Sequence, residues 1–192
     1  MDAGELVQRR REQRLITLSL ADQVPEERWR EPALAGERTI HDLLAHVLAW
    51  DEWAIAVFEI SASRDLPPVL FQASQDVDAY NERAVARFRA LSRDDIISGL
   101  QTAGERALSS AHVGGGADWE LRRIAGLRLP NVQAPAPGAQ LTEAQKHGPS
   151  VRAILRILMI HEAEHDQEIM TTYGVQPNLE RFQEGAESDA DR

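Results

Sequence analysis

The sequence predicts an all-α protein, an antiparallel four-helix bundle with a long loop before the last helix. Apolar residues recur at steps of three and four along most of the chain, and no convincing alternating strand pattern appears. A length of 192 residues fits one domain with a sizeable core. We expect this domain to span residues 1–175, and the acidic residues 176–192 to form a flexible tail.

Capping signals set the expected helix boundaries. Thr39 and Asp42 resemble a capping box that starts the second helix, and Ser92 is the expected cap of the fourth. Pro149 precedes the last helix, and Gly174 ends it. The expected helices cover about residues 4–21, 39–61, 74–91, 92–113 and 150–173.

The chain between Gly114 and Pro149 is rich in Gly and Pro, with one expected short helix over residues 119–124. Irregular segments of this length are often lids or binding loops. With Trp119, Arg122, Arg123 and Arg128, this loop could cover a site and bind an anionic substrate. A plain surface loop with scattered charges is the equal alternative.

Composition excludes several classes of partner. The net charge of −10, from 31 acidic and 21 basic residues, opposes binding to nucleic acid or to an anionic membrane. The run Arg9-Arg10-Arg11 is interpreted as the solvated face of the first helix. There is no cysteine, so any thiol in the chemistry must come from a small molecule. Without a signal peptide or a membrane-spanning segment, we expect a cytoplasmic protein.

Three histidines form the main candidate site. His161 and His165 stand four residues apart on one helix, so both imidazoles lie on the same face. His46 continues the inward row of the second helix, as the other two do in the last helix. Two close ligands and one distant ligand are typical of a metal site with an open coordination position. Each histidine could instead be a buried core residue. Solvated positions are expected for His41, which points about 140° away from His46, and for His112 and His147.

A ligating imidazole usually donates its second N–H to an acceptor. Asp42, Glu164 and Glu168 are the candidates for this role, although carboxylates on such helices commonly face water. The donors suit zinc, nickel, copper or iron.

His161-Glu162-Ala163-Glu164-His165 also matches the H-E-x-x-H motif of zinc proteases, in which Glu162 would be the general base. The extended form of that motif fails here, because Glu168 and Thr171 stand where it requires Gly and His. No strand is expected that could hold a peptide. The protease interpretation is therefore the weaker one.

The chain resembles the DinB/YfiT-like superfamily of metal-binding four-helix bundles over roughly residues 5–173. The resemblance lies in the segments 39–50 (TIHDLLAHVLAW) and 77–82 (VDAYNE) and in the pair His161 and His165. It implies a divalent metal ion, often zinc or nickel, held by His46, His161 and His165, and a homodimer. Relatives include bacillithiol- and mycothiol-dependent transferases, maleylpyruvate isomerase, and colibactin-resistance proteins that hydrolyse a cyclopropane.

The functional expectation is a metal-dependent hydrolase or thiol transferase that acts on a small molecule in detoxification or stress response. The ion would activate water or a low-molecular-weight thiol. A non-catalytic metal-binding bundle and a bundle without metal are the alternatives. The substrate-binding candidates are Trp50, Trp53, Tyr80, Asn81, Trp119 and Arg122; for Tyr80 and Asn81 a structural role is the competing interpretation.

Overall fold

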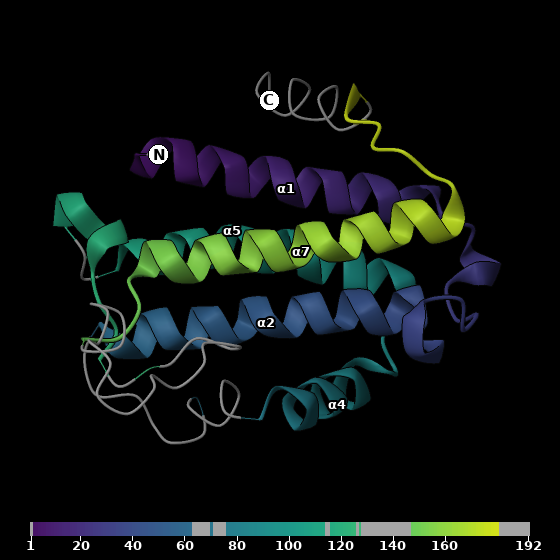
Figure 1. Ribbon diagram of the computed structural model, residues 1–192, viewed down its shortest axis with the longest axis horizontal. Helices are drawn as coiled ribbons and strands as arrows, with labels where there is room; N and C mark the ends of the chain where they lie inside the picture. The colour runs from purple at the N-terminus through teal and green to yellow at the C-terminus, as the bar shows by residue number, and fades with distance from the viewer. Residues whose placement is uncertain are drawn as a thin grey trace, which may run out of the picture.

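Four long helices form a bundle in the computed structural model (Figure 1): α1 (Ala3–Gln23), α2 (Ile40–Ser61), α5 (Arg93–His112) and α7 (Val151–Tyr173). The structure describes residues 2–62, 70, 76–113, 116–125, 127 and 147–180. Over these residues no strand is present, and β-type pairing is limited to the isolated bridges Leu34–Arg38 and Arg123–Ser150. The predicted all-α bundle is confirmed.

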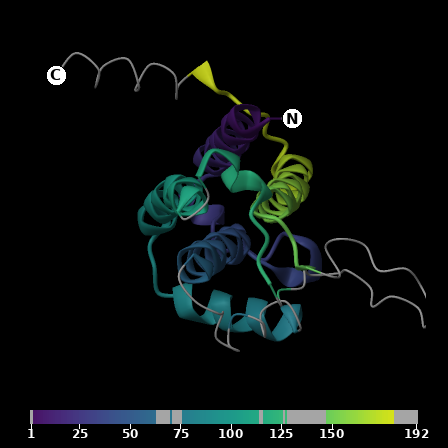
Figure 2. The same ribbon diagram turned by 90° about the vertical axis from the view of Figure 1, so that its left-hand side faces the viewer.

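The shorter helix α4 (Val77–Phe88) determines the direction of the helices that follow it. It packs on the outer side of α2, crosses that helix at an angle (Figure 2), and ends near the start of α5 (Figure 1). As a result α5 starts at the same end as α2, and the two helices run in the same direction (Figure 1). Helices α1 and α7 lie side by side and run in the opposite direction to α2 and α5. This arrangement brings α2 and α7 together as antiparallel neighbours, although about ninety residues separate them in the sequence.

Local capping sets the helix ends, close to the predicted boundaries. The Thr39 hydroxyl accepts from the Asp42 backbone N–H at 3.0 Å, and the Asp42 carboxylate accepts from the Thr39 N–H at 3.3 Å. Ser92 and Asp95 repeat this capping box at the start of α5. Each such cap contributes about 1 kcal/mol to helix stability. Helix α7 ends where Gly174 takes a left-handed conformation with φ +68°.

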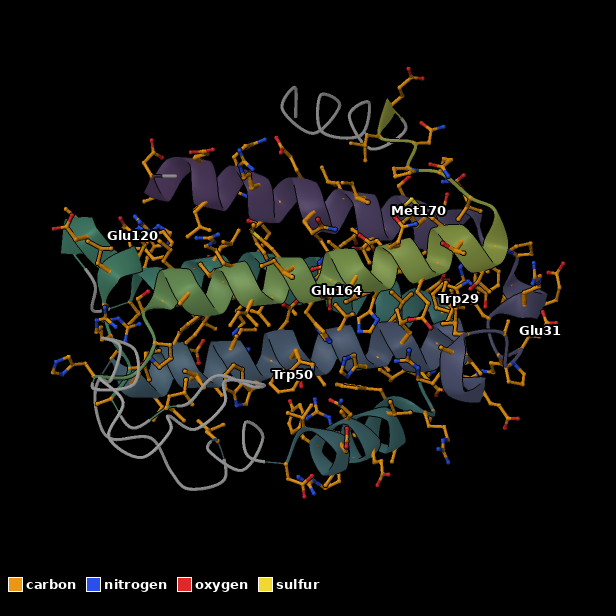
Figure 3. All side chains as sticks on the ribbon, viewed as in Figure 1. Trp29, Glu31, Trp50, Glu120, Glu164 and Met170 are labelled. Carbon is orange, nitrogen blue, oxygen red and sulfur yellow. The ribbon has the colours of Figure 1, made fainter. Side chains whose placement is uncertain are left out.

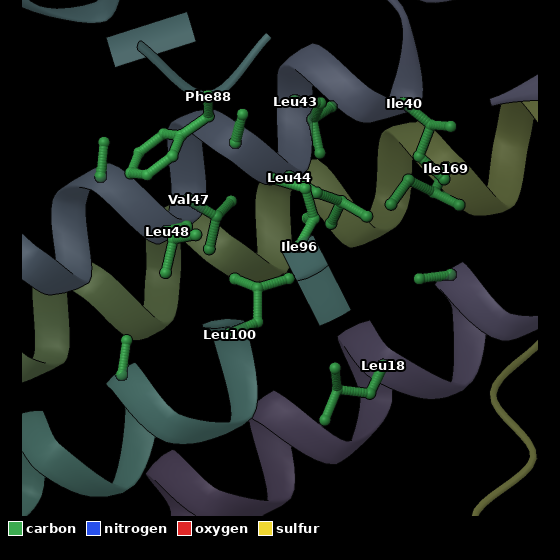
Figure 4. Packing of buried hydrophobic residues seen from close by; sticks show 14 of the residues in the cluster. Leu18, Ile40, Leu43, Leu44, Val47, Leu48, Phe88, Ile96, Leu100 and Ile169 are labelled. Carbon is green, nitrogen blue, oxygen red and sulfur yellow. The ribbon is translucent and has the colours of Figure 1, made fainter. Parts of the chain in front are cut away.

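The core consists of apolar side chains from all four long helices. Figure 4 shows one end of it, where Leu43 and Leu44 of α2 meet Ile96 and Leu100 of α5, all fully buried. Burying one such side chain contributes about 2 kcal/mol to folding. No helix within the described residues is long and apolar enough to cross a bilayer.

The structure corrects the interpretation of two basic positions. Arg10 is only 1% exposed, so Arg9-Arg10-Arg11 is not a uniformly solvated run. His41, expected in solvent, is buried, and its Nε2 lies 3.0 Å from the backbone oxygen of Leu91. In both cases a distant partner outweighs the local sequence pattern.

Parts of the predicted loop and tail are described. The short helix of the loop is the 3-10 helix η3 (Gly116–Leu121), which begins earlier than expected. Residues 128–146 of the predicted binding loop, with Arg128, lie outside the described residues. In the tail, the backbone N–H of Asn178 donates to the Ser19 hydroxyl at 2.7 Å. Residues 181–192 are not among those described.

Candidate metal centre

His46 of α2 faces His161 and His165 of α7 across the bundle interior. The Nε2 atoms of His46 and His161 are 2.9 Å apart, and those of His161 and His165 are 3.0 Å apart. One nitrogen from each ring can be chosen so that all three lie within 4.8 Å of one another. The helical spacing of four residues and the antiparallel pairing of α2 with α7 thus bring the predicted ligands together.

The electrostatic environment keeps the three rings neutral near pH 7. Burial and the neighbouring histidines lower the pKa of His46 to about 3. Burial and His165 lower the pKa of His161 to about 4, and burial and Arg38 also lower the pKa of His165. A neutral imidazole offers a lone pair on one nitrogen. Three such lone pairs converging on one point suit a divalent cation of the zinc or nickel type, so the donor set fits the metal ion.

Glu168 lies on the outer side of His165. One carboxylate oxygen of Glu168 is 3.5 Å from His165 Nδ1, the ring nitrogen that faces away from the cluster. Arg38 binds this carboxylate at 3.0 and 3.1 Å, and the backbone N–H of Ala35 also donates to it at 3.0 Å. Glu168 is therefore placed to accept a hydrogen bond from the Nδ1–H of His165, which would leave the lone pair on Nε2 for a cation.

Asn81 and Tyr80 of α4 reach the other side of the site. The indole N–H of Trp50 donates to the Asn81 side-chain oxygen at 3.1 Å, and Asn81 slightly offsets the lowering of the His46 pKa by burial. The Tyr80 hydroxyl donates to the backbone oxygen of Ala49 at 2.7 Å, and its ring packs 4.8 Å from that of Trp50. Trp50 lies on the side of α2 next to α4 (Figure 3).

Glu162 does not take part in the histidine cluster. Its carboxylate accepts from Arg10, from Arg14 and from the Thr17 hydroxyl, all on α1. Asp51 of α2 binds the same two arginines. We call the four residues Arg10, Arg14, Asp51 and Glu162 the ionic clamp. A carboxylate held by two guanidinium groups is a poor proton acceptor, so the geometry does not favour a protease mechanism.

Several other predicted site residues lie away from the cluster. The Asp42 carboxylate caps α2, and Glu164 is exposed. Trp53 is buried, and its indole N–H donates to the backbone oxygen of Leu70. Trp119 is buried against His112 with ring centroids 4.1 Å apart. Its neighbour Glu120 is at the opposite end of the bundle from Trp29 (Figure 3).

Arg122 is also distant from the histidines. It donates to the Ser61 hydroxyl at the end of α2, about 22 Å along the helix from His46. Sequence reasoning missed Arg38, which lowers the pKa of all three histidines. It lies in an irregular connection, and its partner Glu168 is 130 residues away. No local pattern could have indicated it.

A known protein family matches most of the chain. The family model described as mycothiol maleylpyruvate isomerase N-terminal domain matches residues 10–152. The matched segment contains His46, Trp50 and Asn81 but stops before His161 and His165. The assignment of the two α7 histidines to the site therefore depends on the geometry. No curated protein and no solved structure matched the chain.

Proposed function

The chain belongs to the mycothiol maleylpyruvate isomerase N-terminal domain family, a DinB/YfiT-like family, and we propose that it is a metal-dependent enzyme acting on a small molecule. The reaction would be thiol transfer or hydrolysis in detoxification or stress response. The observation that carries the proposal is the convergence of His46, His161 and His165, with their nitrogens within 4.8 Å. The chain has no cysteine, so the thiol would be a low-molecular-weight cosubstrate.

Each residue around the cluster has a separate part in this proposal. The three imidazoles hold a divalent cation, zinc or nickel, which when bound lowers the pKa of a thiol or a water at neutral pH. Glu168 orients His165, and Arg38 holds Glu168 in place. The ring centroid of Trp50 lies 6.4 Å from those of both His46 and His161, and its indole excludes water from one side of the histidine cluster. Arg38 also places positive charge near the site, which favours an anionic substrate or thiolate.

A non-catalytic metal site is the second candidate. A structural ion is normally closed by a fourth protein ligand, whereas a catalytic ion keeps an open position. Within the described residues the group of possible ligands consists of the three histidines alone. This composition favours the enzyme over a purely structural or sensing role.

Metal analysis and a thiol-transfer assay test the proposal. Protein purified without a histidine tag is expected to contain one zinc or nickel ion per chain. His165→Ala should lose it, while the exposed His112→Ala serves as the matched control and should keep it. The metal-loaded protein is then incubated with monochlorobimane and either mycothiol or bacillithiol to measure thiol transfer. Hydrolysis is measured in a parallel reaction without the thiol. A wild-type chain without stoichiometric metal, or turnover that a chelator leaves unchanged, would contradict the proposal.

A further inference from the structure

A groove between α2 and α4 combines apolar walls with one unpaired cation. We propose that it binds a small organic acid, whose carboxylate pairs with Arg83 and whose apolar body lies against Trp53 and Tyr80. The groove has a volume of about 340 Å³, at the lower end of the roughly 300–1,000 Å³ of small-molecule sites. None of the three clustered histidines lines it. The proposal therefore goes beyond the proposed function and does not depend on its metal ion.

The groove follows from the way α4 packs on α2. The two helices are neighbours (Figure 1, Figure 2), and each turns one face to the space between them. Residues at helical steps of three and four share such a face. On α2 these are Ala49, Trp53 and Ala56, and on α4 they are Tyr80, Arg83 and Ala84. The three alanine methyl groups fill little of the space, so the two aromatic rings form its walls.

The two rings present apolar atoms to the groove, because their polar hydrogens are already donated to backbone oxygens. The indole N–H of Trp53 donates to Leu70 at 3.0 Å, and the Tyr80 hydroxyl donates to Ala49 at 2.7 Å. Both rings also pack on Trp50, with centroid distances of 5.2 and 4.8 Å. Rings fixed in this way need little reordering when a ligand binds, and they favour an apolar or aromatic body.

The charges of the groove favour an anion with a single charge. Arg87 forms an ion pair with Glu52, and its guanidinium lies 4.2 Å from the centroid of the Phe88 ring. Arg83 is exposed at the same groove, and no side chain among the described residues pairs with it. One positive charge is therefore left over beside the apolar walls. A guanidinium binds a carboxylate through two parallel hydrogen bonds, so an apolar carboxylic acid matches both parts of the groove.

Titration of the metal-free, ¹⁵N-labelled full chain with cinnamate tests the site. Cinnamate joins an aromatic ring to one carboxylate, and without metal the histidine cluster cannot hold the acid through a bound ion. The indole N–H signal of Trp53 should shift and saturate. Cinnamamide, a neutral analogue of the same shape, should bind about three- to fivefold more weakly. Arg83→Gln should weaken cinnamate binding by a similar factor and leave cinnamamide binding unchanged.

Two further variants separate the groove from general effects of charge. Arg89→Gln makes the same change of charge at the exposed end of α4, outside the groove, and should bind cinnamate as the wild type does. Ala56→Leu places a larger side chain in the groove. It should abolish the Trp53 shift for both probes while the helical circular dichroism stays that of the wild type.

Four results would overturn the inference. The Trp53 signal could fail to shift with cinnamate, or cinnamamide could bind as tightly as the acid. Arg89→Gln could weaken binding as much as Arg83→Gln, which would indicate a general effect of charge. Ala56→Leu could bind cinnamate as the wild type does, which would place the acid elsewhere. Because no metal is present, none of these results bears on the proposed metal site.

Discussion

Replacing Asp51 by Asn should strongly destabilise the protein, because it leaves the ionic clamp with two cations and one anion. The side chains of Arg10, Arg14, Asp51 and Glu162 are between 1% and 7% exposed. Arginine stays protonated at any accessible pH, so neither Arg10 nor Arg14 can lose its charge. At an effective dielectric constant of about 20, two charges about 4 Å apart interact by about 4 kcal/mol. Breaking a buried pair in this way typically costs about 3–5 kcal/mol.

Urea unfolding of the metal-free protein, followed by circular dichroism, measures this loss without a contribution from bound ions. Glu105→Gln is the matched control, because Glu105 pairs with Arg11 at 2.8 Å while both side chains are half exposed. Its loss should stay below about 1 kcal/mol. A second variant, Arg14→Met with Asp51→Asn, restores the charge balance and should lose less than the two single changes added together. A loss below about 1 kcal/mol for Asp51→Asn would refute the reasoning.

Two further predictions concern pH and a glycine. The pKa is lowered to about 3 for His46 and to about 4 for His161 in the folded protein. Below pH 6.5 the unfolded chain therefore binds more protons at these two residues than the folded protein does. Each histidine should remove about 2 kcal/mol of the free energy of unfolding of the metal-free protein as the pH falls from 7 to 5. Burial and Glu162 raise the pKa of Asp166 to about 7, so this residue stabilises the folded protein as the pH falls, in opposition to the histidines. Asp166→Asn should therefore make the loss of stability with falling pH steeper in urea titrations. An unchanged slope of stability against pH would count against these shifts. Gly148→Ala should cost more than about 2 kcal/mol, because φ is +79° and a Cβ would lie 1.9 Å from the Ile124 oxygen. Gly104→Ala is the comparison in the same thermal melts: its Cβ would meet Arg14 at 3.6 Å, and a gain of up to about 1 kcal/mol in the helix is expected.

Local signals predict the helices well. The capping boxes at Thr39 and Ser92 involve residues three positions apart, so the sequence itself shows both partners. The same holds for His161 and His165, which share a helix face at a spacing of four residues. His46 could be added because it continues an inward-facing row of α2. These features depend on helical geometry alone, and the periodicity of the chain fixes that geometry.

Features that join distant residues could not be predicted in this way. Arg10 reads as one of three adjacent surface arginines, and its partners Asp51 and Glu162 are 41 and 152 residues away. Arg38 depends in the same way on Glu168. Trp119 and Arg122 looked suitable for a lid, but a buried ring contact and a bond to Ser61 place them at the far end of α2. Pairing of this kind follows from the tertiary arrangement, which a single sequence does not reveal.

The histidine cluster and the ionic clamp both depend on α7, which follows the other three long helices in the chain. Until it is made, α1 and α2 present two arginines to a single carboxylate, and His46 has no histidine partner. A nascent chain that ends before residue 151 therefore holds a surplus positive charge that opposes burial of the α1 face. Docking of α7 supplies Glu162 and the two remaining imidazoles at once. Completion of the bundle core and assembly of the site are thus one event, which waits for the synthesis of α7.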